Sequence, residues 1–241
     1  MLPSFMKYIS YLVLAVVFVA QGVSAQQIVF KDQNLKSALL KRGYDFNKNG
    51  EIEVSEIDTV ANLNIAKSDI RLLDDLKYFK SLERVYAMSN QIANLDVFFD
   101  NNTIKEIYIG GNVLGKKLTL KNLRNLTVLA AAHNDLETVE LNGTDSIRQL
   151  YLQSNAFKNI KLENLTNLSV LELIDNKALK TIDIRPNVAL TYIGLLSTAV
   201  SQLDISNNKL LSTFYVSNTV KVIKSAGQEN FKSAPVIREI H

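Results

Sequence analysis

A short run of oxygen-bearing side chains lies near the N-terminus of the chain. It reads Asp45-Phe-Asn-Lys-Asn-Gly-Glu-Ile-Glu-Val-Ser-Glu56 and fits the pattern D-x-[DN]-x-[DN]-G-x5-E at every constrained position. A hard cation such as Ca²⁺ takes about six to eight oxygen ligands, and a tight loop presents alternate side chains to one centre. Gly50 permits the sharp turn that such a loop needs. The spacing therefore predicts a calcium site.

The expected ligands differ in kind. They are the side-chain oxygens of Asp45, Asn47 and Asn49, the backbone carbonyl of Glu51, a direct or water-mediated contact from Glu53 and a bidentate carboxylate from Glu56. The loop resembles the calcium loop of EF-hand proteins. With three carboxylates and no paired second loop, we expect weak binding, about 10⁻⁴ to 10⁻³ M, at a structural site. The alternative is a loop of the same shape that has lost the ion and uses Asn and Asp as turn formers.

A short helix must hold this loop in place. Asp32 is a suitable N-cap, apolar residues follow it three and four positions apart, and Gly43 comes directly after two basic residues. We expect residues 26–59 to form a helical N-terminal cap over the first unit of the segment that follows.

From Val60 onward the phrase L-x-x-L-x-L-x-x-N-x-L recurs every 21 or 22 residues. Its first positions are Val60, Leu82, Ile104, Leu126, Ile147, Leu168, Leu190 and Leu211. Its polar position carries Ser68, Asn90, Asn112, Asn134, Asn155, Asn176 and Thr198. Apolar residues two apart share one face of a strand, so stacked units would merge them into a continuous core. An asparagine amide both donates and accepts, so it can satisfy backbone groups that the turn buries.

This phrase resembles the leucine-rich repeat, and its period is similar to that of secreted bacterial proteins of the internalin-like kind, which an EF-hand-like helical cap often precedes. The resemblance covers residues 60–223 and implies an α/β repeat fold. The implied structure is a right-handed solenoid of about eight coils, with one short parallel strand per coil on the concave side. We expect residues 224–241 to form a C-terminal cap or tail. A second apolar row is expected on the convex side, at Leu95, Leu120, Val139, Ile160, Ile182 and Leu203.

Residues 1–25 have the pattern of a secretory signal peptide. Lys7 precedes an apolar run of about a dozen residues, and the segment ends on Val23-Ser24-Ala25. The run is short for a membrane span, which needs about 20 apolar residues, although an uncleaved anchor is the alternative. We therefore expect a secreted protein, periplasmic or extracellular, with no membrane span after cleavage.

The amino-acid composition excludes several kinds of functional site. The chain has no cysteine, two histidines and a formal net charge of +3. These values exclude disulfides and thiolate chemistry, and they argue against histidine-based catalysis and nucleic-acid binding. No motif for a nucleophile, an acid–base pair or a phosphate cradle is present, so we expect a protein that is not an enzyme.

Tyrosines gather where the repeat would face the concave solvent side. The fifth position of the repeat carries Tyr86, Tyr108, Tyr151 and Tyr215, Tyr192 lies beside this column at a third position, and Met88 lies in the mostly apolar seventh column. Tyrosine offers a large contact area and a polar tip at low entropic cost, which suits a partner protein and also a glycan. Aromatic residues also suit strands for stability alone. The leading hypothesis is a recognition module that binds through its concave face, and the alternative is a purely structural exported or surface protein without a specific ligand.

Overall fold

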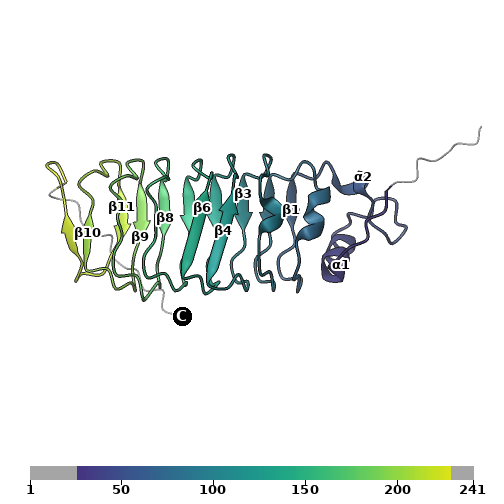
Figure 1. Ribbon diagram of the computed structural model, residues 1–241, viewed down its shortest axis with the longest axis horizontal. Helices are drawn as coiled ribbons and strands as arrows, with labels where there is room; N and C mark the ends of the chain where they lie inside the picture. Colours follow the sequence, from purple (N-terminus) through teal and green to yellow (C-terminus); the bar gives the residue numbers. More distant parts are fainter. Residues whose placement is uncertain (1–25, 229–241) are drawn as a thin grey trace, which may run out of the picture.

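The structure is a computed structural model that describes residues 26–228. Figure 1 shows an elongated solenoid whose coils stack in chain order, with helices α1 (Gln33–Lys41) and α2 (Val54–Ile57) at one end and strand β10 (Gln202–Asp204) at the other. The proposed signal peptide and most of the proposed C-terminal tail lie outside the described residues. None of the helices within residues 26–228 is long and apolar enough to span a membrane.

One strand from each of eight coils joins a parallel sheet. The sheet order is β1-β2-β3-β5-β7-β8-β9-β11. The strands are β1 (Asn62–Asn64), β2 (Arg84–Tyr86), β3 (Glu106–Tyr108), β5 (Val128–Ala130), β7 (Gln149–Tyr151), β8 (Val170–Glu172), β9 (Tyr192–Gly194) and β11 (Thr213–Tyr215). Leu63 pairs with Val85, Val85 with Ile107, and so on to Phe214, in the steps of 21 and 22 residues that the sequence predicts. The predicted solenoid is confirmed.

The convex side is built from shorter and less regular elements. They are the 3₁₀ helices η1 (Asp74–Tyr78) and η2 (Asp96–Phe98) and the strands β4 (Lys117–Lys121), β6 (Thr138–Asn142), β10 and β12 (Lys221–Ile223). The predicted convex row is wrong at one point. In the β4–β6 pair, Leu118 lies opposite Val139 and Leu120 lies opposite Leu141, so Leu120 and Val139 belong to different rows. The paired residues keep the 21-residue step of the repeat, whereas Leu120 and Val139 are 19 residues apart and so cannot share a row.

The core is a single apolar column inside the coils. The inward residues of the eight strands, such as Leu129, Leu150 and Leu171, are fully buried. Each buried leucine contributes about 1.5–3 kcal/mol, and because each coil is covered only by its neighbours, the array is stable as a stack. The predicted asparagine ladder is present. Asn112, for example, donates from Nδ2 to the carbonyls of Ala87 (3.0 Å) in the preceding coil and Ile109 (2.9 Å) in its own.

A second amide ladder runs along the later coils. Asn187 and Asn208 are fully buried, and the Nδ2 group of Asn208 donates to the carbonyls of Ile184 (2.9 Å) and Asn187 (2.8 Å). Gln228 extends the same row by donating to the carbonyl of Asn208 (3.3 Å). This second ladder was not predicted, although the spacing of 21 residues between Asn187 and Asn208 repeats the main period.

The turn that leaves each of the first seven concave strands uses a left-handed residue. Lys67, Ser89, Gly111, His133, Ser154, Asp175 and Ser197 all have φ between 53° and 65°. The N–H groups of the first six donate to carbonyls of the next coil, as in the bond from His133 to the carbonyl of Gln153 (3.1 Å). A non-glycine residue in this conformation costs about 1–2 kcal/mol, which the hydrogen bond between coils offsets. The exposed His133 is therefore explained by its place in a turn.

The helical cap is tied to the first coil through Asp32. One carboxylate oxygen caps α1 by accepting from the N–H of Asn34 (2.8 Å), and the other accepts from the N–H groups of Arg71 (2.6 Å) and Leu72 (2.9 Å). Arg42 adds a hydrogen bond from its guanidinium to the carbonyl of Ala66 (3.0 Å). These contacts fix the loop of residues 45–56 relative to the sheet.

Candidate functional site

The concave face of the eight-stranded sheet brings the predicted tyrosines into register. Tyr86 lies opposite Tyr108, Tyr151 lies two strands beyond Tyr108, and Tyr215 lies opposite Gly194. Tyr192 occupies the neighbouring column, opposite Thr213. All five tyrosines are half-buried, so each presents part of its ring to solvent. The tyrosines that the repeat places in one column therefore lie along one face of the sheet.

The first two tyrosines form a stacked pair. The ring centroids of Tyr86 and Tyr108 are 4.7 Å apart and the ring planes differ by 11°. The Tyr108 hydroxyl donates to Glu106 (3.0 Å), and the other oxygen of that carboxylate accepts from the Arg84 guanidinium (2.8 Å). This network holds the two rings in one orientation, so little side-chain entropy remains to be lost when a partner covers them.

The environment of Tyr108 changes its acidity. Burial, and then its hydrogen bond to the Glu106 carboxylate, raise the pKa of Tyr108 from 10.0 to about 12. In the unfolded chain the same hydroxyl ionises near its ordinary value, so its contribution to stability is complete below pH 10 and is lost as the pH rises through about 12. We expect an ultraviolet titration to show late-ionising tyrosines, including Tyr192, and we expect Tyr108→Phe to remove the one that ionises near pH 12. Loss of a step near pH 10 in that variant would contradict this assignment.

The remaining tyrosines surround a carboxylate. The Tyr192 hydroxyl donates to Glu172 (2.5 Å), and the centroids of the Tyr192 and Tyr215 rings are 5.8 Å apart. Burial, and then this hydrogen bond, raise the pKa of Tyr192. The Glu172 carboxylate lies against Gly194 of the next strand, in the place where a β-carbon would otherwise be. The repeat pattern points to the tyrosines but not to Glu172 and Gly194, although both lie in the same fifth column.

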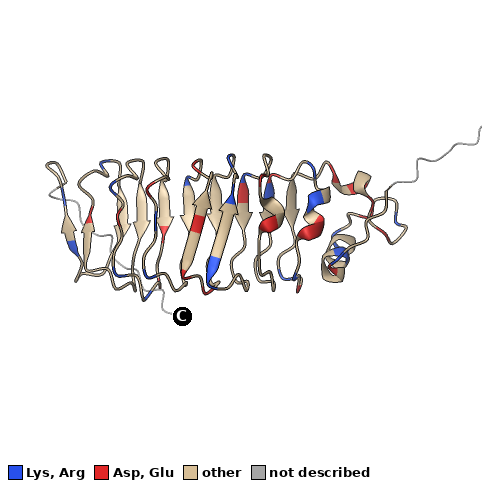
Figure 2. Ribbon diagram, viewed as in Figure 1, with Lys and Arg blue, Asp and Glu red and all other residues tan. Residues whose placement is uncertain are grey.

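The seventh column gives the surface an apolar margin. Met88, Gly110, Ile174 and Leu196 are half-buried, and Ala132 is buried. The eight concave strands carry three charged residues, Arg84, Glu106 and Glu172, whereas the convex strands β4 and β6 carry charges of both signs (Figure 2). The concave face therefore combines aromatic rings, apolar side chains and a few fixed polar groups, which is the composition of surfaces that bind other molecules.

The loop of residues 45–56 is closed by its own hydrogen bonds. Asp45 accepts from the N–H groups of Asn49 (3.1 Å) and Gly50 (2.9 Å), and Glu53 accepts from the amides of Asn47 (3.1 Å) and Asn49 (2.8 Å). Within residues 26–228, no group of three or more His, Cys, Asp or Glu side chains is arranged to hold a metal ion. The two amide nitrogens face Glu53, so calcium binding would require both amides to turn their oxygens inward.

Glu56, the last expected ligand, is buried at the base of this loop. Its carboxylate accepts from the N–H groups of Phe46 (2.7 Å), Asn47 (3.2 Å) and Glu53 (3.0 Å). Burial raises its pKa, but the hydrogen bonds from Glu53, Asn47 and Phe46 outweigh burial and hold the pKa below its ordinary value. The Glu56 carboxylate is therefore held in the anionic form that a calcium ligand requires. The Glu51 side chain instead pairs with Lys36 (2.6 Å), which leaves its backbone carbonyl as the group available to an ion.

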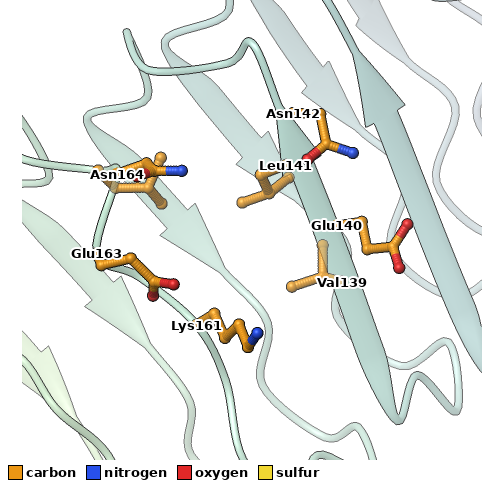
Figure 3. Close-up of a pocket in the computed structure, with 8 residues that line it drawn as sticks. Val139, Glu140, Leu141, Asn142, Lys161, Glu163 and Asn164 are labelled. Atoms are coloured by element: carbon orange, nitrogen blue, oxygen red, sulfur yellow. The ribbon is translucent and has the colours of Figure 1, made fainter.

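A hollow of about 420 Å³ lies on the convex side between β6 and the next coil. It is lined by Val139, Glu140, Leu141, Asn142, Lys161, Glu163, Asn164 and Leu165. β6 pairs with β4 on one side, whereas residues 158–162 form no strand on the other. Figure 3 shows Lys161 and Glu163 pointing towards β6, while the Glu140 carboxylate points away, where it pairs with Lys117 (2.7 Å). The hollow results from the failure of neighbouring convex segments to pair.

Comparison with known proteins gives structural matches only. No protein-family model matches the sequence. No curated protein matches it either. Among solved structures, the functional domain of InlJ from Listeria monocytogenes, which includes a cysteine ladder, matches with a TM-score of 0.63 and 22% identity over 82% of this chain. The match spans 46% of that domain, so this chain covers less than half of its length.

Two further internalins of Listeria monocytogenes share the architecture. The internalin InlF matches with a TM-score of 0.56 and 16% identity, over 85% of this chain and 79% of that one. Internalin C2 matches with a TM-score of 0.51 and 18% identity, over 82% of this chain and 100% of that one. Because the identities are low, these similarities concern the fold. The chain therefore folds as a leucine-rich-repeat solenoid of the kind found in these Listeria internalins.

Proposed function

We propose that this protein is an exported, non-enzymatic recognition module whose concave sheet binds a partner protein or glycan. The observation that carries the proposal is the row of half-buried tyrosines across the sheet, which includes the stacked pair of Tyr86 and Tyr108. A row of aromatic rings with fixed hydroxyl groups is a large contact surface that loses little entropy on binding. The internalin-like fold supports a protein-binding module, and the pattern of residues 1–25 supports export.

The proposal is tested by affinity capture from the surfaces of candidate target cells. The purified protein is compared with the triple variant Tyr86→Ala, Tyr108→Ala and Tyr151→Ala, after circular dichroism has shown that the variant is folded. We expect a protein or glycan that the parent retains and the triple variant does not. A matched control is Tyr78→Ala, because Tyr78 lies in η1 on the convex side. Equal retention by parent and triple variant would contradict binding through the concave face.

We further propose that the loop of residues 45–56 binds calcium and stiffens the N-terminal cap. The intact pattern of oxygen ligands and the anionic Glu56 support this proposal. A concentration about tenfold above Kd stabilises the folded state by about 1.4 kcal/mol, which corresponds to a rise in Tm of about 3–5 °C for a chain of this size. We expect that rise between chelator and calcium at about 10 mM, and we expect Glu56→Gln to abolish it.

The matched control for this experiment is Glu51→Gln. The Glu51 side chain pairs with Lys36, so only its backbone carbonyl belongs to the expected ligand set. This variant should keep the calcium response of the parent. A Tm that does not change between chelator and calcium in the parent would refute the site.

A further inference from the structure

Glu172 is exceptional among the charged residues of the concave sheet. The third, fifth and seventh columns of the sheet contain the charged residues Arg84, Glu106 and Glu172. Arg84 and Glu106 neutralise each other through an ion pair of 2.8 Å. Among the described residues, no Lys, Arg or His side chain forms an ion pair with Glu172, which accepts hydrogen bonds from the Tyr192 hydroxyl and, at 3.4 Å, from the N–H of Ile174. Within these three columns of the described sheet, Glu172 is therefore a negative charge that no cation pairs.

The neighbouring strand leaves room for the Glu172 carboxylate. Gly194 lies opposite Glu172 on the neighbouring strand, and a β-carbon at Gly194 would collide with the carboxylate. The absence of a side chain thus lets Glu172 lie flat against the sheet, where Tyr192 donates to it. The neighbouring column positions bring Tyr151 to one side of Glu172 and Tyr215 to the other side of Gly194. The result is a half-buried anion bordered by three aromatic side chains.

We propose that Glu172, Tyr151, Tyr192 and Tyr215 form a subsite for the cationic side chain of an arginine or lysine on a partner protein. This inference rests on the proposed binding role of the concave face and adds the chemistry of the partner. A guanidinium or ammonium group gains an ion pair with the carboxylate and favourable contacts with the faces of aromatic rings. Partial burial lowers the local dielectric constant and strengthens such an ion pair. Arginine is favoured because its planar group both stacks on rings and forms two hydrogen bonds with one carboxylate.

Local rather than overall charge must attract this group. The chain has a formal net charge of +3, so a basic peptide gains nothing from the protein as a whole. Recognition of a basic residue would therefore depend on Glu172 itself and on its position. This dependence makes the subsite testable by one substitution that removes the charge and another that displaces it.

The test uses random 12-residue peptides displayed on phage and selected on the purified protein expressed from the full chain. We expect the selected peptides to share an arginine or lysine at one position. Their affinity should fall about tenfold or more in Glu172→Gln, because the cation then loses its charged hydrogen-bond acceptor. Gly194→Ala keeps the charge but pushes the carboxylate from its place, and it should weaken the same peptides. Glu163→Gln, which removes an exposed carboxylate from the convex hollow, should leave their affinity unchanged.

A second arm changes the peptide. Replacing the shared arginine by citrulline, its neutral analogue, should weaken binding to the parent by the same factor and should have no further effect in Glu172→Gln. Two results would overturn the subsite and leave the proposed function intact. In the first, the selected peptides lose binding in the triple tyrosine variant but contain no shared basic residue. In the second, they bind Glu172→Gln and Gly194→Ala as tightly as they bind the parent. Selected peptides that bind the triple tyrosine variant unchanged would overturn both.

Discussion

Asn155→Ala should lower the free energy of unfolding by about 4 kcal/mol or more, because it removes the four hydrogen bonds of 3.1 Å or less that this side chain makes at one junction between coils. The Asn155 Oδ1 atom accepts from the N–H groups of Asn134 (3.1 Å) and Leu136 (3.0 Å). Its Nδ2 group donates to the carbonyls of Ala131 (3.0 Å) and Leu152 (3.0 Å). Each buried backbone group left without a partner costs about 1–3 kcal/mol. Urea unfolding followed by circular dichroism measures the difference.

The matched control is Asn207→Ala, an exposed asparagine next to the buried Asn208. Because its side chain faces solvent, this change should alter the free energy of unfolding by about 0.5 kcal/mol or less. If Asn155→Ala had an effect as small as that of the control, the asparagine ladder would not stabilise the stack, and the recurrence of asparagine in the repeat would need another physical cause.

Loss of the stacked tyrosine pair should have the largest effect on binding. The double variant Tyr86→Ala and Tyr108→Ala should lower the affinity for the captured partner about 100-fold, since an aromatic residue at the centre of an interface contributes about 2 kcal/mol or more. The two single variants should show coupling, because the rings are in contact and each orients the other. Titration calorimetry or surface plasmon resonance measures these affinities.

Tyr108→Phe separates the ring from the hydroxyl group. This variant keeps the stack on Tyr86 and loses only the hydrogen bond to Glu106. We expect its affinity to lie within about threefold of the parent, because the ring supplies most of the contact area and the lost hydroxyl bonds to Glu106 within the protein. An effect as large as that of the double alanine variant would mean that the hydroxyl network, and not the aromatic surface, determines recognition.

The repeat itself made most of the fold predictable. Apolar positions such as Leu63, Val85 and Ile107 set the strand register, and a shift by one residue would have turned each of them to solvent. The same register brought Tyr86 against Tyr108. On the convex side the expected alignment of Leu120 with Val139 failed because these residues are 19 apart, whereas the paired strands keep the 21-residue step of the repeat.

The contacts around Glu172 could not be predicted from the aligned repeats, because they join residues at different repeat positions. Glu172 meets Tyr192 diagonally, from a different column and a different coil. Its position also depends on a missing side chain at Gly194. A pattern search favours residues that recur, whereas this arrangement arises from two residues that interrupt the tyrosine column.

Hydroxyl-radical footprinting of the complex with the captured partner tests the central claim most directly. Binding through the concave face predicts that oxidation decreases at Tyr86, Tyr108, Tyr151, Tyr192 and Tyr215. Tyr44 and Tyr78, which lie in the cap loop and on the convex side, should be oxidised equally with and without the partner. Protection confined to the convex segments, such as those around Val139 and Lys161, with the concave tyrosines unprotected, would contradict the account.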